Sequence, residues 1–118
     1  MNSSTWIGAG ALLALALSAQ ARAADPSDIQ DGKKLALQTC AACHTVAADQ
    51  TQTPALQPRA PSFLSIANDP TVTQPLLIEF LQLKHKSVKT PPDMPTMLLT
   101  PKEATAAADY IMSLRKSR

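Results

Sequence analysis

The chain has 118 residues, of which 45% are hydrophobic but only 3% aromatic, and its formal net charge at pH 7 is +2. A chain of this length forms one small domain, and with so few aromatic side chains it has little apolar bulk for a core of its own. The nearly balanced charge, without a basic stripe carrying interleaved aromatic residues, excludes a nucleic-acid-binding domain.

The first 23 residues are interpreted as a secretory signal peptide. The apolar run over residues 7–17 has the length of a signal-peptide core and is too short to span a bilayer comfortably. Ala19-Gln20-Ala21 and Ala21-Arg22-Ala23 are both small-x-small cleavage sites, and we favour the second, with cleavage after Ala23 and an exported protein. Residues 24–118 then form the single folded domain, without a stable membrane span once the signal is removed.

The first helix of this domain is predicted from a capping pattern. Ser27, preceded by Pro26 and followed by an acidic first turn, opens a capping box, and the helix is expected to run to about Ala42. Gly32 lies inside it, where glycine costs about 1 kcal/mol relative to alanine. It is the only glycine after the signal, so we expect another backbone or ring to pass close to it.

The end of this helix carries the only two cysteines of the chain, Cys40 and Cys43, with His44 directly after the second. This Cys-x-x-Cys-His pattern is typical of the attachment site of a c-type haem. Cysteines one helical turn apart present both sulfurs to one edge of a planar macrocycle, so each can close a thioether to a vinyl group. The imidazole of His44 can then bind the iron. We therefore predict one covalent haem c attached to these two cysteines.

Three other uses of the same residues fit less well. A structural zinc site usually needs four ligands, and the sequence has no second Cys/His cluster to complete one. A thioredoxin-like dithiol would lie in a βαβ pattern, which the sequence does not show. A disulfide across so short a span would hold little of the fold in place, and it would leave His44 unexplained.

The middle of the domain is predicted to alternate short helices with proline-stiffened loops. Residues 47–62 form a polar loop, and residues 62–68 form a short helical piece. Thr73 is the expected N-cap of a helix that ends near Leu83. Residues 84–100 are expected to be irregular.

The last helix has the clearest start signal. Thr100, Pro101 and Glu103 supply the cap, the first-turn proline and the glutamate of a capping box. Small and aliphatic side chains then recur at helical spacing and are expected to face the core: Ala104, Ala107, Ala108, Ile111 and Leu114. No alternating strand pattern occurs in the sequence, so the predicted fold class is all-α.

An iron bound by His44 needs a ligand on its other face, and four residues are candidates. Met112 lies within the last helix, where methionine is most often a packing residue. His85 stands between two lysines and is most simply a solvated residue. Met94 is flanked by prolines that fix the backbone around a weak thioether ligand, and Met97 follows three residues later. We predict Met94 as the axial ligand and keep Met97 and His85 as alternatives.

Residues 26–116 resemble the small mono-haem class I c-type cytochromes of the bacterial periplasm. The resemblance rests on the glycine-bearing first helix before Cys-Ala-Ala-Cys-His, an Ala-Pro-Ser-Phe segment, a Met-Pro pair, and the closing Leu-Thr-Pro-Lys-Glu and Ala-Asp-Tyr-Ile-Met-Ser-Leu segments. A haem motif near the N-terminus with the methionine near the C-terminus fits class I and not the four-helix-bundle cytochromes. The resemblance implies three main helices and short helical pieces wrapped around one haem.

The resemblance also implies roles for single residues. Gly32 would lie where the first helix crosses the last, against Tyr110. The carbonyl of Pro61 would accept a hydrogen bond from the imidazole of His44, and contacts of this kind tune a bound metal. Met94 would be the axial methionine.

The function implied is that of a soluble periplasmic electron carrier and not an enzyme, because His/Met ligation leaves the iron no open position for a substrate. Its partners would be redox proteins, a donor dehydrogenase and an acceptor oxidase or other cytochrome. Lys84, Lys86 and Lys89 would either guide docking to an acidic patch on such a partner or simply keep their loop solvated. The alternatives are a dedicated cytochrome c subunit of a periplasmic dehydrogenase complex, and a peroxidase-like or gas-sensing protein with a labile sixth ligand.

Overall fold

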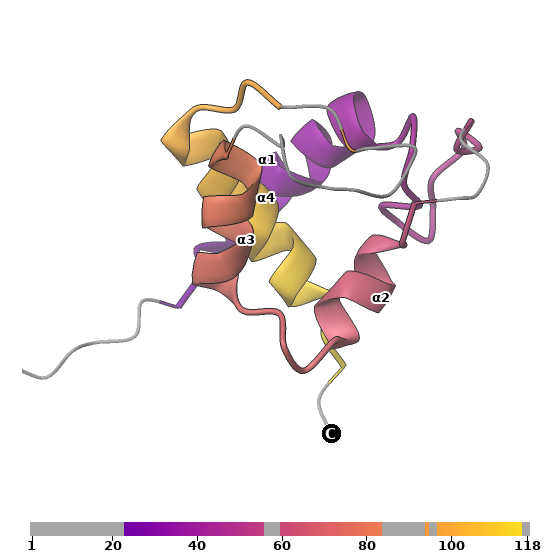
Figure 1. Cartoon of the computed structure of the whole chain (residues 1–118). Coiled ribbons are helices and arrows are strands. Elements are labelled where there is room, and N and C mark those ends of the chain that lie inside the picture. Colours follow the sequence, from indigo (N-terminus) through magenta and orange to yellow (C-terminus); the bar gives the residue numbers. More distant parts are fainter. Residues whose placement is uncertain (1–22, 56–59, 84–93, 95–96, 117–118) are drawn as a thin grey trace, which may run out of the picture.

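The computed structural model describes residues 23–55, 60–83, 94 and 97–116. The regular elements of this part of the chain are all helical, with no strand among them, which confirms the all-α fold class. In chain order they are α1 (Pro26–Leu35), the π-helical turn η1 (Ala36–Cys40), α2 (Phe63–Asn68), α3 (Gln74–Gln82) and α4 (Pro101–Ser113) (Figure 1). α4 is the central element, because α1, α2 and α3 all pack against it. No helix in the described ranges is long and apolar enough to cross a membrane.

α1 begins two residues earlier than the sequence predicts. Its N-cap is Asp25, whose side chain accepts a hydrogen bond from the backbone N–H of Ser27 at 2.8 Å, so the predicted Ser27 cap is wrong. The reason is Pro26, which lacks a backbone N–H and has a preset φ that suits the first helical position. The residue before a proline in that position takes the cap. The expected signal peptide lies outside the described residues, apart from Ala23.

The predicted continuous helix to Ala42 is also wrong, because α1 ends at Leu35. The next segment is the wider π-helical turn η1, in which the N–H of Ala41 donates to the carbonyl of Ala36 at 3.0 Å. Such turns are rare and often occur at functional sites. η1 ends at Cys40, so the cysteine motif still lies at the end of the first helical segment.

α1 crosses α4 at Gly32. A β-carbon on Gly32 would lie 2.0 Å from the carbonyl oxygen of Ala106 and 2.8 Å from the β-carbon of Tyr110. The prediction that Gly32 lies against Tyr110 where the first helix crosses the last is therefore confirmed. The buried side chains of α4 around this crossing are mostly small, which lets the two backbones approach: Ala104, Ala106, Ala107 and Ala108.

The later helices start where the sequence predicts. Thr73 caps α3, and Ser62 caps the short α2. Thr100 and Glu103 form the capping box of α4, with the N–H of Thr100 donating to Glu103 Oε2 at 2.8 Å and the N–H of Glu103 donating to Thr100 Oγ1 at 3.3 Å. The bonds from the backbone and side chain of Thr100 hold the pKa of Glu103 below its ordinary value, so the box is charged at neutral pH.

The segment after α4 returns to the connection between α2 and α3. Arg115 Nε donates to the carbonyl of Ala67 at 2.5 Å, and its Nη2 donates to the carbonyls of Asp69 at 3.1 Å and Val72 at 2.7 Å. The last carbonyls of a helix have no partner within it. Arg115 supplies a donor to one of them, that of Ala67, and two more to the connection after α2, and so fastens α2 to the end of α4.

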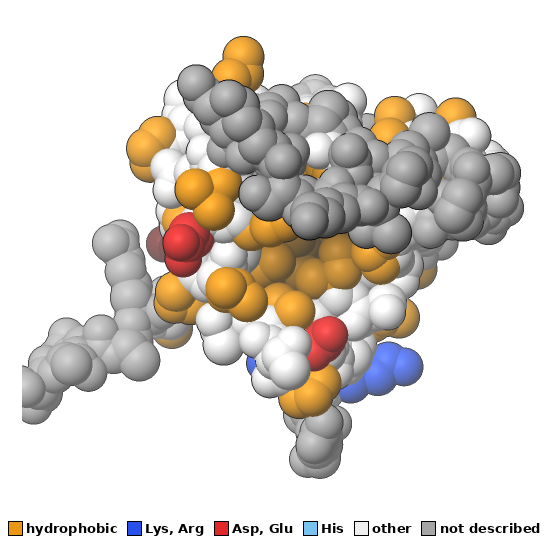
Figure 2. Space-filling model, in the orientation of Figure 1, with side chains coloured by type: hydrophobic (Ala, Val, Ile, Leu, Met, Phe, Trp, Pro, Cys, Tyr) orange, Lys and Arg blue, Asp and Glu red, His pale blue; other side chains and the backbone are white. Residues whose placement is uncertain are grey.

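Two hydrophobic clusters make up the described core, and Ile78 of α3 packs against both. The first consists of Ala36, Ala41, Val46, Ala47, Phe63, Ala67, Leu77, Ala108, Tyr110 and Ile111. The second consists of Leu81, Ala104 and Ala107. Between the helices the molecular surface is hollowed, and hydrophobic side chains form much of the wall of this hollow (Figure 2).

One carboxylate is buried in this core. Asp109 of α4 is only 5% exposed, and its Oδ1 accepts a hydrogen bond from the side-chain amide of Gln74 in the first turn of α3. A buried charge is costly unless it is hydrogen-bonded. The Gln74–Asp109 pair therefore sets how α3 sits on α4.

Candidate functional site

The two cysteines of the motif lie after α1, Cys40 at the end of η1 and Cys43 in the turn that follows it. Cys40 is the last residue of η1, and its carbonyl accepts hydrogen bonds from the N–H groups of Cys43 at 3.1 Å and His44 at 2.9 Å. The two side chains are free thiols and partly buried. Burial, and to a smaller extent the neighbouring Cys43, raises the pKa of Cys40 to about 11. Its sulfur is therefore uncharged at neutral pH, as it would also be in a thioether.

His44 is buried, with 8% of its surface exposed, and its ring is held by a backbone carbonyl. Its Nδ1 lies 2.7 Å from the carbonyl oxygen of Pro61. A carbonyl oxygen only accepts hydrogen bonds, so Nδ1 must carry the proton and Nε2 of the neutral ring keeps its lone pair. No described residue forms a hydrogen bond with Nε2. The ring nitrogen left to bind a metal is therefore Nε2.

The Pro61 carbonyl is held in place by the segment that follows His44. The N–H of Phe63 donates to the carbonyl of Thr45 at 3.0 Å, which fastens the start of α2 beside the motif. The ring of Phe63 packs against the imidazole with ring centres 5.5 Å apart and the planes tilted by 54°. Tyr110 of α4 lies behind Phe63, with ring centres 6.4 Å apart. His44 is therefore supported on one side by an aromatic row that reaches the central helix.

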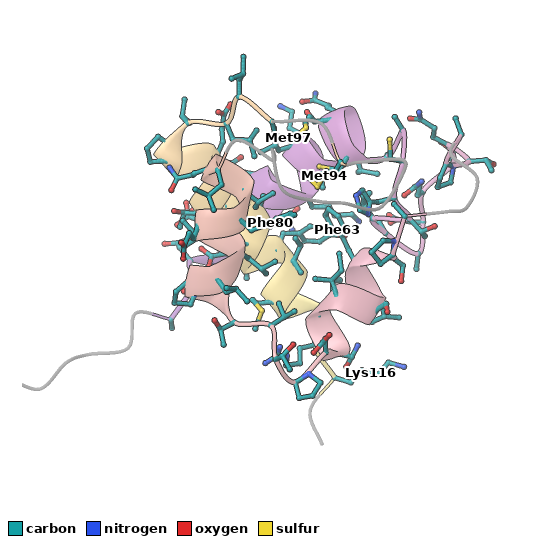
Figure 3. The ribbon with its side chains drawn as sticks, viewed as in Figure 1. Phe63, Phe80, Met94, Met97 and Lys116 are labelled. Carbon is teal, nitrogen blue, oxygen red and sulfur yellow. The ribbon has the colours of Figure 1, made fainter. Side chains whose placement is uncertain are left out.

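Met94 belongs to the segment that leads into α4 and comes from a different part of the core. It is partly buried and packs against the second hydrophobic cluster, whereas Phe63, the ring beside His44, belongs to the first. Figure 3 shows Met94 and Met97 on the same segment, with Phe63 on α2 and Phe80 on α3. Ile78 of α3 packs against both clusters, so α3 connects the part of the core that holds Met94 with the part that holds Phe63.

The other candidate ligands are distributed as follows. Met112 packs against the first hydrophobic cluster, which confirms its expected role as a packing residue. Met97 is partly buried. His85 lies outside the described residues, as do the three lysines expected to guide docking, Lys84, Lys86 and Lys89. Within the described ranges, no group of three or more His, Cys, Asp and Glu side chains could hold a metal ion on its own.

A comparison with protein-family models decides which family these features belong to: the cytochrome c model matches residues 29–115. The chain belongs to the cytochrome c family. Comparisons with curated proteins and with solved structures gave no significant match. Membership makes this cytochrome a haem-binding electron carrier whose cofactor is covalent haem c and whose partners are redox proteins.

The residues present fit that cofactor. Cys40 and Cys43 are two free, uncrosslinked thiols at the required spacing, and His44 keeps an unprotonated ring nitrogen. Haem also needs an apolar surface, and the hollow in Figure 2 supplies one. One large apolar side chain of the surrounding elements, Phe80 of α3, is still 37% exposed (Figure 3). Apolar area of this kind is what a large planar ring would cover.

Sequence reasoning missed the contacts that hold the motif from behind. The hydroxyl of Tyr110 donates to the carbonyl of Val46 at 2.8 Å, and the amide of Gln50 bonds to the same short segment. The family resemblance implies that Tyr110 lies against Gly32 but gives no destination for its hydroxyl group. Gln50 stands in a polar loop, where the sequence carries no signal for a glutamine side chain that folds back on its own backbone.

Proposed function

We propose that this cytochrome is an exported periplasmic electron carrier, cleaved after Ala23, in which His44 and Met94 are the two axial ligands of the haem iron. The observation that carries the proposal is the hydrogen bond between His44 Nδ1 and the Pro61 carbonyl at 2.7 Å, which leaves Nε2 to face a metal. When bound, haem supplies one-electron redox chemistry, and a methionine ligand favours its reduced state. Cys40 and Cys43 would hold the ring covalently.

The chain's own residues explain why a carrier is favoured over an enzyme. His44 is fixed by a carbonyl and by the ring of Phe63, so it has little freedom to move between oxidation states. Met94 is partly buried against Leu81, Ala104 and Ala107, which restrains its side chain in the same way. Two restrained ligands leave no open position for a substrate, and they limit the rearrangement that accompanies each electron transfer.

Absorption spectra of the purified holoprotein test the ligand assignment. The oxidised wild type should show a sulfur-to-iron band near the red edge, and Met94→Ala should abolish that band. Met97→Ala and Met112→Ala are matched controls and should keep it. Loss of the band in Met97→Ala alone would move the ligand to that residue. Carbon monoxide binding to the reduced wild type at neutral pH would instead indicate a labile sixth ligand, as in a peroxidase or gas sensor.

Two further experiments test the cellular part of the proposal. N-terminal sequencing of the mature protein should start at Ala24, and a chain that still begins with Met1 would contradict cleavage. Copurification with a larger subunit in stoichiometric amount would identify a dedicated dehydrogenase subunit and not a free carrier. The lysines at positions 84, 86 and 89 are proposed to speed docking. Unchanged reduction rates at low salt after neutralising all three would refute that role.

A further inference from the structure

The loop after His44 is held together by one side chain, Gln50. Its Oε1 accepts a hydrogen bond from the N–H of Val46 at 2.7 Å, and its Nε2 donates to the carbonyls of His44 at 3.3 Å and Gln52 at 2.6 Å. The backbone N–H of Gln50 also donates to the carbonyl of Ala47 at 3.3 Å. One half-buried amide therefore bonds to both sides of the segment that leaves the histidine.

The backbone is hydrogen-bonded on both sides of the His44 α-carbon. On one side, the N–H of His44 donates to the carbonyl of Cys40 at 2.9 Å. On the other side, Gln50 bonds to the carbonyl of His44 and to the N–H of Val46, while Tyr110 bonds to the carbonyl of Val46 at 2.8 Å. Val46 is itself only 1% exposed. The position of the His44 α-carbon is thus set from before by η1 and from after by Gln50.

This placement matters because the backbone position of His44 determines how its Nδ1 lies relative to the Pro61 carbonyl. The hydrogen bond at Nδ1 spans 2.7 Å, so it requires the imidazole ring and the Pro61 carbonyl to keep their relative positions. That segment is fastened to the same backbone through the N–H of Phe63 and the carbonyl of Thr45. The Pro61 segment thus follows Thr45, so a shift of the His44 backbone relative to Thr45 would move the imidazole relative to the Pro61 carbonyl.

We propose that Gln50 is a positioning residue for the axial ligand: it fixes the backbone of His44 so that Nδ1–H stays aligned on the Pro61 carbonyl. The inference rests on the proposed ligation of iron by His44. A hydrogen bond at Nδ1 raises the basicity of a metal-bound imidazole. A more basic imidazole favours ferric iron, so loss of alignment should raise the reduction potential of the cytochrome.

The test uses the holoprotein and two matched variants. Gln50→Met keeps the length of the side chain but removes all its hydrogen bonds. Gln52→Met is the control, because Gln52 takes part in this network only through its backbone carbonyl. In the reduced protein, NMR should show the His44 Nδ1 proton exchanging with solvent about tenfold faster in Gln50→Met than in wild type. A change of this size is expected when one hydrogen bond is lost. The potential of Gln50→Met should also rise, with neither change in Gln52→Met.

Three outcomes separate the possibilities. Slow proton exchange and an unchanged potential in Gln50→Met, with only a lower melting temperature, would overturn the inference and leave Gln50 a loop-stabilising residue. If Gln50→Met does not fold, Gln50→Glu decides: it keeps the acceptor for Val46 and loses the donor to His44, so its Nδ1 proton should still exchange faster than in wild type. A wild type without a spectrum of histidine-ligated haem would refute the proposed function itself.

Discussion

Replacing Gly32 with alanine puts a methyl group into the crossing of α1 and α4, where the neighbouring atoms belong to the backbone. The new β-carbon would lie 2.0 Å from the carbonyl oxygen and 2.6 Å from the carbonyl carbon of Ala106. Real β-carbons essentially never approach another atom closer than 3.0 Å. A helical backbone offers no rotamer change to relieve this overlap, so the two helices must separate by about 1 Å.

The magnitude follows from two opposing effects. Overpacking a core costs 1–3 kcal/mol, and a clash with backbone lies at the upper end, about 3 kcal/mol. Alanine in a helix is about 1 kcal/mol better than glycine. The net loss in the free energy of unfolding is then about 2 kcal/mol, which lowers the melting temperature of a domain this small by about 8–16 °C.

Thermal and urea unfolding of the holoprotein, followed by circular dichroism, measure this loss. Asp31→Ala is the control, because it places alanine at the exposed neighbouring position of the same helix, away from the crossing, and should change stability by less than about 0.5 kcal/mol. The double variant Gly32→Ala/Ala106→Gly should not recover stability, since the clash involves the backbone of residue 106 and not its side chain. A Gly32→Ala protein as stable as wild type would refute the close crossing.

Three other contacts give predictions of the same kind. Burial raises the pKa of Tyr110, so its contribution to stability is present below the ordinary tyrosine pKa of about 10 and is lost as pH rises through the higher folded-state value. Tyr110→Phe should cost about 1 kcal/mol at neutral pH, because it removes the hydrogen bond to Val46. In a pH series of melting temperatures, it should also weaken the loss of stability at alkaline pH. Arg115→Met should cost about 1–2 kcal/mol in urea unfolding, because three carbonyls lose their donor. Gln74→Leu should cost about 2 kcal/mol in the same assay, because it leaves the buried carboxylate of Asp109 without this amide donor.

Each of these has an outcome that would contradict it. A Tyr110→Phe protein with the same alkaline loss as wild type would mean that another group titrates there. Arg115→Lys should recover only part of the stability lost in Arg115→Met, since lysine lacks the planar fork of donors; full recovery would mean that charge alone matters. If Gln74→Leu and the double variant Gln74→Leu/Asp109→Leu were equally unstable, the cost would not come from the unpaired carboxylate.

The sequence was sufficient for those features that depend on local chemistry or on a repeating pattern. Thr73 and Thr100 are recognisable caps because a hydroxyl before a proline-bearing first turn has few other uses. An isolated glycine within a helix needs a packing reason, so Gly32 predicts a close approach, and the family resemblance implies that the last helix makes it. The cap of α1 was misplaced because Asp25 and Ser27 are both good caps, and the preference of Pro26 for the first helical position decides between them.

The features that escaped prediction depend on atoms far apart in the chain. The π-helical turn before Cys40 has no composition signal, because its residues would also suit an ordinary α-helix. The bond from Tyr110 to Val46 joins residues 64 positions apart, and only the packing of α4 brings them together. Gln50 bonds to backbone carbonyls and N–H groups, which every residue possesses, so no residue type marks its partners.

Because α1, α2 and α3 all pack against α4, the N-terminal helices can complete their packing only once α4 is present. α1 finds its main partner in the last helix to be synthesised, and Tyr110 and Arg115 of the same C-terminal region secure the loops that precede α2 and α3. A chain released from its N-terminus onward therefore has no docking surface for α1 until nearly every residue has emerged. We therefore expect Cys40, Cys43 and His44 to remain accessible for haem attachment until α4 is available to pack against α1.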